Sequence, residues 1–225
     1  SLGEGAPETC LSILRTAAAQ QAALPAGHVM PLLFTAAAED QPELVLHLLE
    51  ACAGGYDLAW RLLKPLVTMH GTAIGPWVDM HASVAGALLP RLAEEVASGR
   101  QQLDSERLGL FVHKALAAQQ EEALAAILQA AARAQVQLSS EDAATALGQA
   151  VRLGAARSAA LLLKAGPRLP ASMLQDNAEL AARRRDARML NVLLAVGAAV
   201  SEGMFLVALN NLSLPLLAAL LRRGR

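Results

Sequence analysis

The sequence predicts an all-α protein built as a solenoid of stacked helix-turn-helix repeats. Of its 225 residues, 49 are Ala and 43 are Leu, and both residue types favour helices. Aromatic residues make up only 3% of the chain, and β-branched residues are sparse, which argues against sheets. One apolar pattern also recurs along the chain in a fixed order, as it does in repeat proteins. The length allows a sizeable core, either as one domain or as one array.

The repeat is clearest between residues 147 and 166. Leu147 is followed by the small pair Ala150-Val151, a break at Gly154, the pair Ser158-Ala159 and the apolar pair Leu162-Leu163. Each copy therefore predicts a short helix, a turn, and a second helix with apolar residues at i, i+3 and i+4. Such a hairpin buries its apolar face only against neighbouring copies. This repeat frame fits four further copies without gaps, with breaks at Asp40, Gln119, Arg185 and Leu212.

The elements are expected in the following order. Residues 1–30 form an N-terminal capping helix, and residues 31–225 form the array. Residues 54–107 do not fit the repeat frame and are expected to form one long irregular unit, with helices over 56–70 and 77–99 around a loop. Two prolines, Pro42 and Pro215, suit the first turn of second helices. Three glycines suit helix C-caps with left-handed backbone, namely Gly166, Gly197 and Gly224.

The repeat frame resembles the ankyrin repeat, in which T-P-L-H, two alanines, a glycine turn, paired aliphatic residues, L-L and G-A follow one another. His113 is the only histidine at the T-P-L-H position, so the capping network of regular repeats is largely missing. The resemblance covers roughly residues 31–53 and 108–225, and it implies a helical stack that binds proteins. The matching residues are Thr145, Leu147, Ala150, Gly154, Leu162, Leu163 and Gly166 in one copy, and Ala181, Ala182, Leu193, Leu194, Gly197 and Ala198 in the next.

The sequence contains no recognisable catalytic or cofactor motif. Phosphate-binding glycine loops, G-x-S-x-G, H-E-x-x-H and C-x-x-C are all absent. His70, Asp79 and His81 are the best candidates for a metal or acid–base cluster, but a spacing of two residues points Asp79 and His81 to different faces of a helix. Cys10 and Cys52 have no metal-binding spacing and are expected to be buried free thiols. We therefore expect no enzyme, no metal and no cofactor within this chain.

Charge and hydropathy exclude some classes of binding partner for this chain. The net charge is −1 and charged residues are 17% of the chain, so the whole chain is not a nucleic-acid-binding surface. No apolar run reaches the ~18 residues of a membrane span, and the first ten residues do not have the pattern of a signal peptide. The missing initiator Met suggests an excised fragment. We expect a reducing, cytoplasmic location, or the cytosol of a host after secretion.

Arginine is distributed unevenly and supplies the candidate binding surface. Arg183, Arg184 and Arg185 form a run, and Arg152 takes the place of Arg183 in the preceding copy. Stacking would align these side chains into a basic strip along the concave side or its rim, suited to carboxylates or phosphates. The alternative is a solvated helix end with favourable dipole interactions. Candidate partner-binding residues are Glu39, Asp40, Gln119, Arg152, Arg168, Arg183, Arg184, Ser201, Glu202, Asn210 and Asn211.

We therefore expect a protein-protein interaction module that holds a partner, with an acidic surface, on the concave face and inter-repeat loops. Two alternatives stay open. The first is the target-recognition domain of a larger bacterial effector enzyme, for example one that modifies host caspases; 16 Arg against 3 Lys suits a GC-rich genome. The second is an oligomerisation domain that pairs through an exposed face of Leu216, Leu217, Leu220 and Leu221.

Overall fold

The computed structural model describes residues 25–52, 55–63 and 82–223, and all regular structure in these ranges is α-helical. The predicted all-α class is therefore confirmed. The chain divides into two compact units, residues 1–103 and 104–225. Several expectations fall outside the described residues: most of the capping helix, the loop over 71–76, and Cys10, His70, Asp79, His81 and Gly224.

The N-terminal unit contains four described helices. Helix α2 packs on α3 as a hairpin, and α3 also contacts α4 and α5. Helix α2 crosses the expected boundary between residues 30 and 31. Pro42 is the first residue of α3, as its fixed backbone angle favours. The helices are α2 (Ala26–Ala38), α3 (Pro42–Ala51), α4 (Gly55–Leu63) and α5 (Ala82–Ala97).

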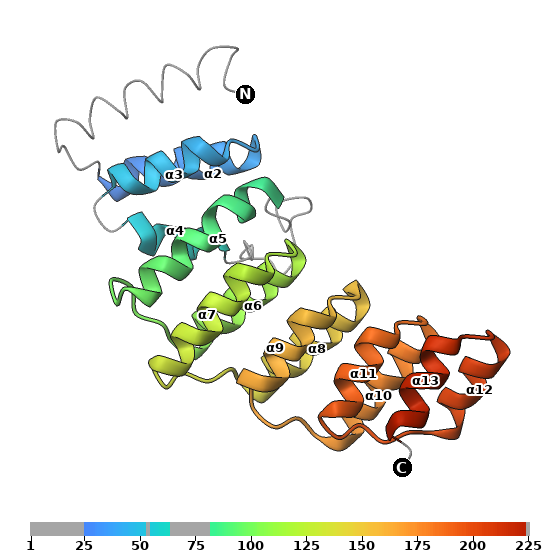
Figure 1. Cartoon of the computed structure of the whole chain (residues 1–225). Coiled ribbons are helices and arrows are strands. Elements are labelled where there is room, and N and C mark those ends of the chain that lie inside the picture. The colour runs from blue at the N-terminus through green and yellow to red at the C-terminus, as the bar shows by residue number, and fades with distance from the viewer. Residues whose placement is uncertain (1–24, 53–54, 64–81, 224–225) are drawn as a thin grey trace, which may run out of the picture. The chain divides into compact units, whose positions relative to one another are not determined.

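The C-terminal unit is a stack of four helical hairpins (Figure 1). The first helices of successive hairpins contact one another and so do the second helices, which gives two layers. We call the turn inside each hairpin its tip, and the opposite end, where loops join one hairpin to the next, its open end. The first layer contains α6 (Ser105–Ala117), α8 (Ser140–Leu153), α10 (Ala171–Arg183) and α12 (Glu202–Asn210); the second contains α7 (Glu121–Arg133), α9 (Ala156–Ala165), α11 (Ala187–Ala195) and α13 (Leu214–Arg223).

The five helix breaks expected from the repeat frame share one backbone geometry. Asp40, Gln119, Gly154, Arg185 and Leu212 all have left-handed φ angles, between 49° and 73°. At the third break, the Gly154 amide donates to the carbonyl of Val151 at 3.2 Å, and the following amide donates to the carbonyl of Ala150 at 2.9 Å. The same two bonds close the other four turns, as in the Schellman motif that ends many helices. Only one of the five residues is glycine, so the turn is recognised by its place in the frame.

The small residues of the repeat frame are buried. The first alanine of each small pair is at most 1% exposed, and aliphatic residues of the second helices, including Leu124 and Leu193 at 0%, are buried as well. A methyl side chain lets neighbouring helices pack at interior density. The five alanines are Ala36, Ala115, Ala150, Ala181 and Ala208.

One glycine expectation is wrong. Gly197 has φ 106° as expected, but Gly166 has φ −86° and ψ 177°, which is extended backbone. A Cβ at Gly166 would lie 2.7 Å from the carbonyl oxygen of Leu162. Glycine at this position therefore allows a close approach of backbone to backbone.

Candidate partner-binding surface

Three of the four candidate arginines of the C-terminal unit, Arg152, Arg183 and Arg184, lie at neighbouring hairpin tips. Arg152, Arg183 and Asn210 share one position of the repeat frame, in the last turns of α8, α10 and α12. All three are exposed, and the three helices are neighbours in the first layer. Arg184, the next residue after α10, is also exposed. We call Arg152, Arg183 and Arg184 the tip arginines.

Gln119 and Arg168 have different positions within the same unit. Gln119 is exposed at the tip between α6 and α7, two hairpins before the tip of Arg183. Arg168 is exposed in the loop that follows α9, at the open end. Helix α9 carries the chain about 15 Å away from the tip, at 1.5 Å per residue. Arg168 therefore does not join the tip arginines.

Glu39 and Asp40 belong to the N-terminal unit. Asp40 is exposed at the tip between α2 and α3, and its carboxylate accepts a hydrogen bond from the Ser83 hydroxyl of α5. Glu39 is the C-cap of α2, and its amide donates to the carbonyl of Thr35 at 2.9 Å. Both residues thus occupy the frame positions of Arg184 and Arg185, with the opposite charge.

Arg183 is held on one side by an acidic side chain. Its Nη2 lies 3.7 Å from Oε2 of Glu179, one helical turn earlier. Glu179 is itself fixed, because its Oε1 accepts from Ser201 Oγ at 3.3 Å and from Gln175 Nε2 at 3.4 Å. The Arg183 side chain remains 71% exposed. Because a guanidinium has five N–H donors, Arg183 keeps donors for a further carboxylate.

A small hollow lies beside Arg183. It has a volume of about 160 Å³, and it opens between α10 and α12 with an aliphatic lining beside the two charged side chains. Its size suits one aliphatic side chain of a partner. The residues around it are Glu179, Ala182, Arg183, Gly203, Met204 and Val207.

Two of the candidate residues support the fold directly. Asn211 accepts a hydrogen bond from Arg185 Nη2 at the neighbouring tip, and its own Nδ2 donates to the carbonyl of Val207 at 2.7 Å. Ser201 caps α12 by accepting from the amide of Met204 at 3.4 Å. Arg185, the third arginine of the run, therefore joins two hairpins. Glu202, by contrast, is exposed in the first turn of α12, at the open end.

A polar cluster that the repeat frame did not reveal joins α6 to α8. The ring of His113 contacts two side chains of α8: Nδ1 lies 3.2 Å from Gln149 Oε1, and Nε2 lies 3.8 Å from Asp142 Oδ1. Asp142 also accepts from the hydroxyl of Ser139, the N-cap of α8, at 2.7 Å. A Cβ at Gly109 would lie 2.8 Å from Asp142 Oδ2, so glycine makes room for this carboxylate. The contacts of His113 and Asp142 join two neighbouring helices.

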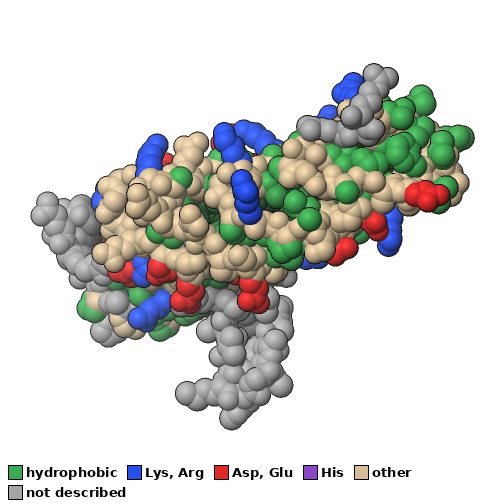
Figure 2. All heavy atoms as spheres, turned by 90° about the horizontal axis from the view of Figure 1, so that it is seen from below, with side chains coloured by type: hydrophobic (Ala, Val, Ile, Leu, Met, Phe, Trp, Pro, Cys, Tyr) green, Lys and Arg blue, Asp and Glu red, His purple; other side chains and the backbone are tan. Residues whose placement is uncertain are grey.

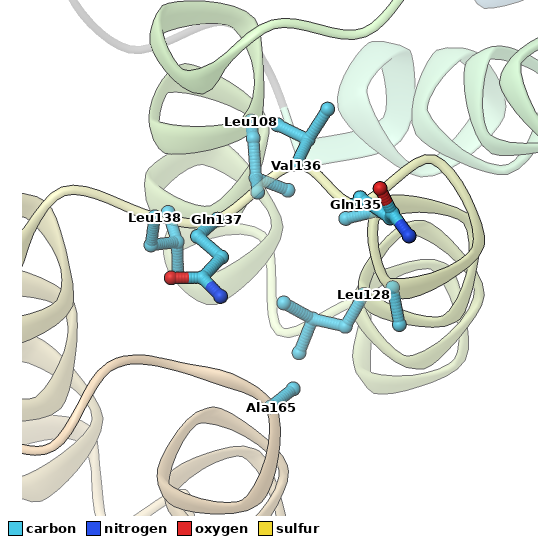
Figure 3. Close-up of a pocket in the computed structure, with 9 residues that line it drawn as sticks. Leu108, Leu128, Gln135, Val136, Gln137, Leu138 and Ala165 are labelled. Atoms are coloured by element: carbon cyan, nitrogen blue, oxygen red, sulfur yellow. The ribbon is translucent and has the colours of Figure 1, made fainter.

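A larger cavity of about 530 Å³ lies at the open ends of the first two hairpins of this unit (Figure 3). Aliphatic side chains and the amides of Gln135 and Gln137 surround it, without a charged group. Such a lining offers shape and hydrogen bonds but no acid, base or metal ligand. Its residues are Leu108, Leu128, Ala131, Ala132, Gln135, Val136, Gln137, Leu138 and Ala165.

Two further observations concern reactive groups. Cys52 is a buried free thiol, as expected, and burial raises its pKa, which suppresses the nucleophilic thiolate. Across the described ranges, no group of three or more His, Cys, Asp and Glu side chains is arranged to hold a metal ion.

The two units differ in net charge. Residues 1–103 carry 5 Lys and Arg against 10 Asp and Glu, whereas residues 104–225 carry 14 against 10. The basic excess therefore belongs to the hairpin stack. None of the described helices combines the length and the apolarity that crossing a membrane requires.

The fold and its exposed tips define an all-α protein with a stack of helical hairpins. Comparison with protein-family models, with curated proteins and with solved structures finds no match for this chain.

Proposed function

We propose that this chain is a protein-binding module of ankyrin-like repeats, which captures an acidic surface of a partner through the hairpin tips and the adjoining face of its first-helix layer. The observation that carries this proposal is the alignment of Arg152 and Arg183 at one frame position of neighbouring, contacting helices. Both are exposed, and Arg184 adds a third positive charge at the second tip.

The repeat character is supported by the turns. Five hairpins close with the same pair of hydrogen bonds at the spacing of the repeat frame. In the C-terminal unit, each hairpin also packs on the next through both of its helices. A stack of this kind presents equivalent side chains in rows, which is how repeat proteins form extended binding surfaces.

The chemistry of the tips favours carboxylates of a protein. Arginine forks bind carboxylates in bidentate geometry, and the unit that carries them has a basic excess. The hollow beside Arg183 adds room for an aliphatic side chain next to the charge. Single-stranded nucleic acids, in contrast, require exposed aromatic side chains for stacking, and none of the aromatic residues in the described ranges is exposed. A reducing compartment, cytoplasm or host cytosol, is part of the proposal and is compatible with the free thiol of Cys52.

A peptide display library selected against the full chain tests this proposal directly. We expect enrichment of peptides in which Asp or Glu stands near an aliphatic residue. These peptides should bind the double variant Arg183→Glu/Arg184→Glu about tenfold or more weakly, which corresponds to about 1.4 kcal/mol. Binding should also weaken as salt rises, because exposed charges are screened.

A matched control reverses two arginines at the open ends. Arg133 is at the end of α7 and Arg168 is in the loop after α9; both are exposed. Arg133→Glu/Arg168→Glu changes the net charge by the same amount and should leave peptide binding unchanged. If both double variants lost peptide affinity equally, the loss would come from the change in net charge and not from the tip arginines. Enrichment of peptides without acidic residues would also contradict the proposal.

A further inference from the structure

The last described hairpin exposes an unusual number of leucines. On α12, α13 and the turn between them, five leucine side chains are 52–87% exposed. Figure 2 shows hydrophobic side chains gathered at its right-hand end, where Figure 1 places α12 and α13. We call this surface the end face; its residues are Leu206, Leu209, Leu212, Leu214 and Leu221.

The repeat frame shows what such a surface normally packs against. Leu209 is 53% exposed, whereas Leu116, Val151 and Ala182, at the same frame position of the other three hairpins, are at most 2% exposed. Those three residues are covered because another hairpin follows in the stack. Among the described helices, Leu209 therefore lies at a position of the hairpin-to-hairpin interface that no further hairpin covers.

Leu221 in α13 shows the same difference in exposure, here within the second layer. It is 62% exposed, while its equivalents Leu128 and Leu194 are 6% and 4% exposed and the third equivalent, Leu163, is partly buried. The expectation from the sequence that Leu216 and Leu220 are exposed is wrong, because both are 0% exposed and pack inside the hairpin stack. The exposed apolar residues are on the opposite side of the last hairpin.

We propose that a second copy of this chain covers the end face in a symmetric dimer. The charges at its rim support a self-complementary contact. Glu202 in the first turn of α12 and Arg222 near the end of α13 are both exposed and lie at the same open end, because the helices of a hairpin run in opposite directions. Neither side chain forms an ion pair within the described residues.

A two-fold axis parallel to these helices satisfies both features. It lays α12 of one copy on α13 of the other, so that the leucines of the two end faces pack together. It also brings Glu202 opposite Arg222 of the second copy, twice. In an isologous interface of this kind, each contact occurs in both directions, and the assembly closes at two subunits. Opposite charges at the rim set the orientation, while the apolar centre supplies the affinity.

Sedimentation velocity of the full chain over a range of concentrations tests the dimer. We expect dimers for the wild type, and a dissociation constant raised by about 100-fold or more for Leu209→Glu/Leu221→Glu, because truncated or charged central positions dominate interface energetics. The control Leu32→Glu/Leu153→Glu changes two leucines that are 44% and 42% exposed and that belong to α2 and α8, not to the last hairpin. It should dimerise like the wild type. Circular dichroism establishes that the variants keep their helix content.

The rim charges test the orientation. Glu202→Arg and Arg222→Glu should each weaken the dimer by about three- to tenfold, as for exposed ion pairs that occur twice, and the combined variant should recover most of this loss. Arg183→Glu/Arg184→Glu should still dimerise, which separates the end face from the tips.

Three results would overturn the proposal: a wild type that stays monomeric at about 100 µM, an end-face variant that still dimerises, or a combined rim variant as weak as the single ones.

Discussion

Two glycines of helix α8, Gly148 and Gly154, should respond in opposite directions to the same substitution. Gly154 ends the helix with φ 73°, whereas Gly148 lies within the helix. A Cβ at Gly154 would have only Asp186 Oδ2 nearby, at 3.5 Å, and a Cβ at Gly148 would lie 3.6 Å from Arg152 Nη1. Neither substitution creates a collision, so the backbone conformation alone decides the sign.

The magnitudes follow from the conformational preferences of alanine. Left-handed backbone costs alanine about 1–2 kcal/mol, and the smaller entropy of the unfolded chain returns about 0.4–1 kcal/mol. Gly154→Ala should therefore destabilise the protein by about 0.5–1 kcal/mol. Within a helix, alanine is favoured over glycine by about 0.5–1 kcal/mol, so Gly148→Ala should stabilise it.

Thermal unfolding followed by circular dichroism measures both effects. With about 1.5 kcal/mol between the two variants, their melting temperatures should differ by about 3–6 °C, since a chain of this size shifts by about 2–4 °C per kcal/mol. Urea unfolding with an unchanged m-value provides a second measurement. Equal stability of the two variants, or a Gly154→Ala variant more stable than Gly148→Ala, would refute the shared left-handed turn.

Two further predictions concern a helix cap and a thiol. Asp186 Oδ1 accepts from the amide of Met189 at 2.9 Å as the N-cap of α11; Asp186→Ala should lower the free energy of unfolding by about 1 kcal/mol and Asp186→Asn by much less, and equal losses would exclude the capping role. In a Cys10→Ser variant, Cys52 should react with a thiol reagent far more slowly in the folded than in the urea-unfolded chain, because its thiol is buried and its pKa is raised. Equal rates would show that Cys52 is accessible in the folded state.

The hairpin tips show why local sequence could predict so much of the fold. Each tip is closed by backbone hydrogen bonds that span no more than five residues, for example from Ala155 to Ala150. The small residues, the break and the aliphatic pairs of one hairpin all lie within about twenty consecutive residues. Even Asp40, Gln119 and Arg185, which do not favour left-handed backbone as glycine does, could be placed at the turns from their frame position alone.

The candidate surface could be predicted only in part. Arg152 and Arg183 share a frame position, and their alignment follows once neighbouring hairpins stack. Arg168 lies close to the run in sequence, yet helix α9 places it at the other end of its hairpin. The bond from Arg185 to Asn211 joins residues 26 positions apart, and the cluster of His113 with Asp142 and Gln149 joins helices of two hairpins. No local pattern encodes such pairs, because each depends on how two hairpins are set side by side.

By itself, the sequence determined the all-helical class, the five turns and the small residues that let helices approach, since these depend on backbone propensity and on a periodic apolar pattern. Only the tertiary structure decided which apolar residues are covered. Leu209 and Ala182 occupy the same frame position, but the first is 53% exposed and the second 1%. The physical reason is that burial depends on what packs against a residue: among the described helices, a further hairpin packs on the side of Ala182 and none packs on the side of Leu209.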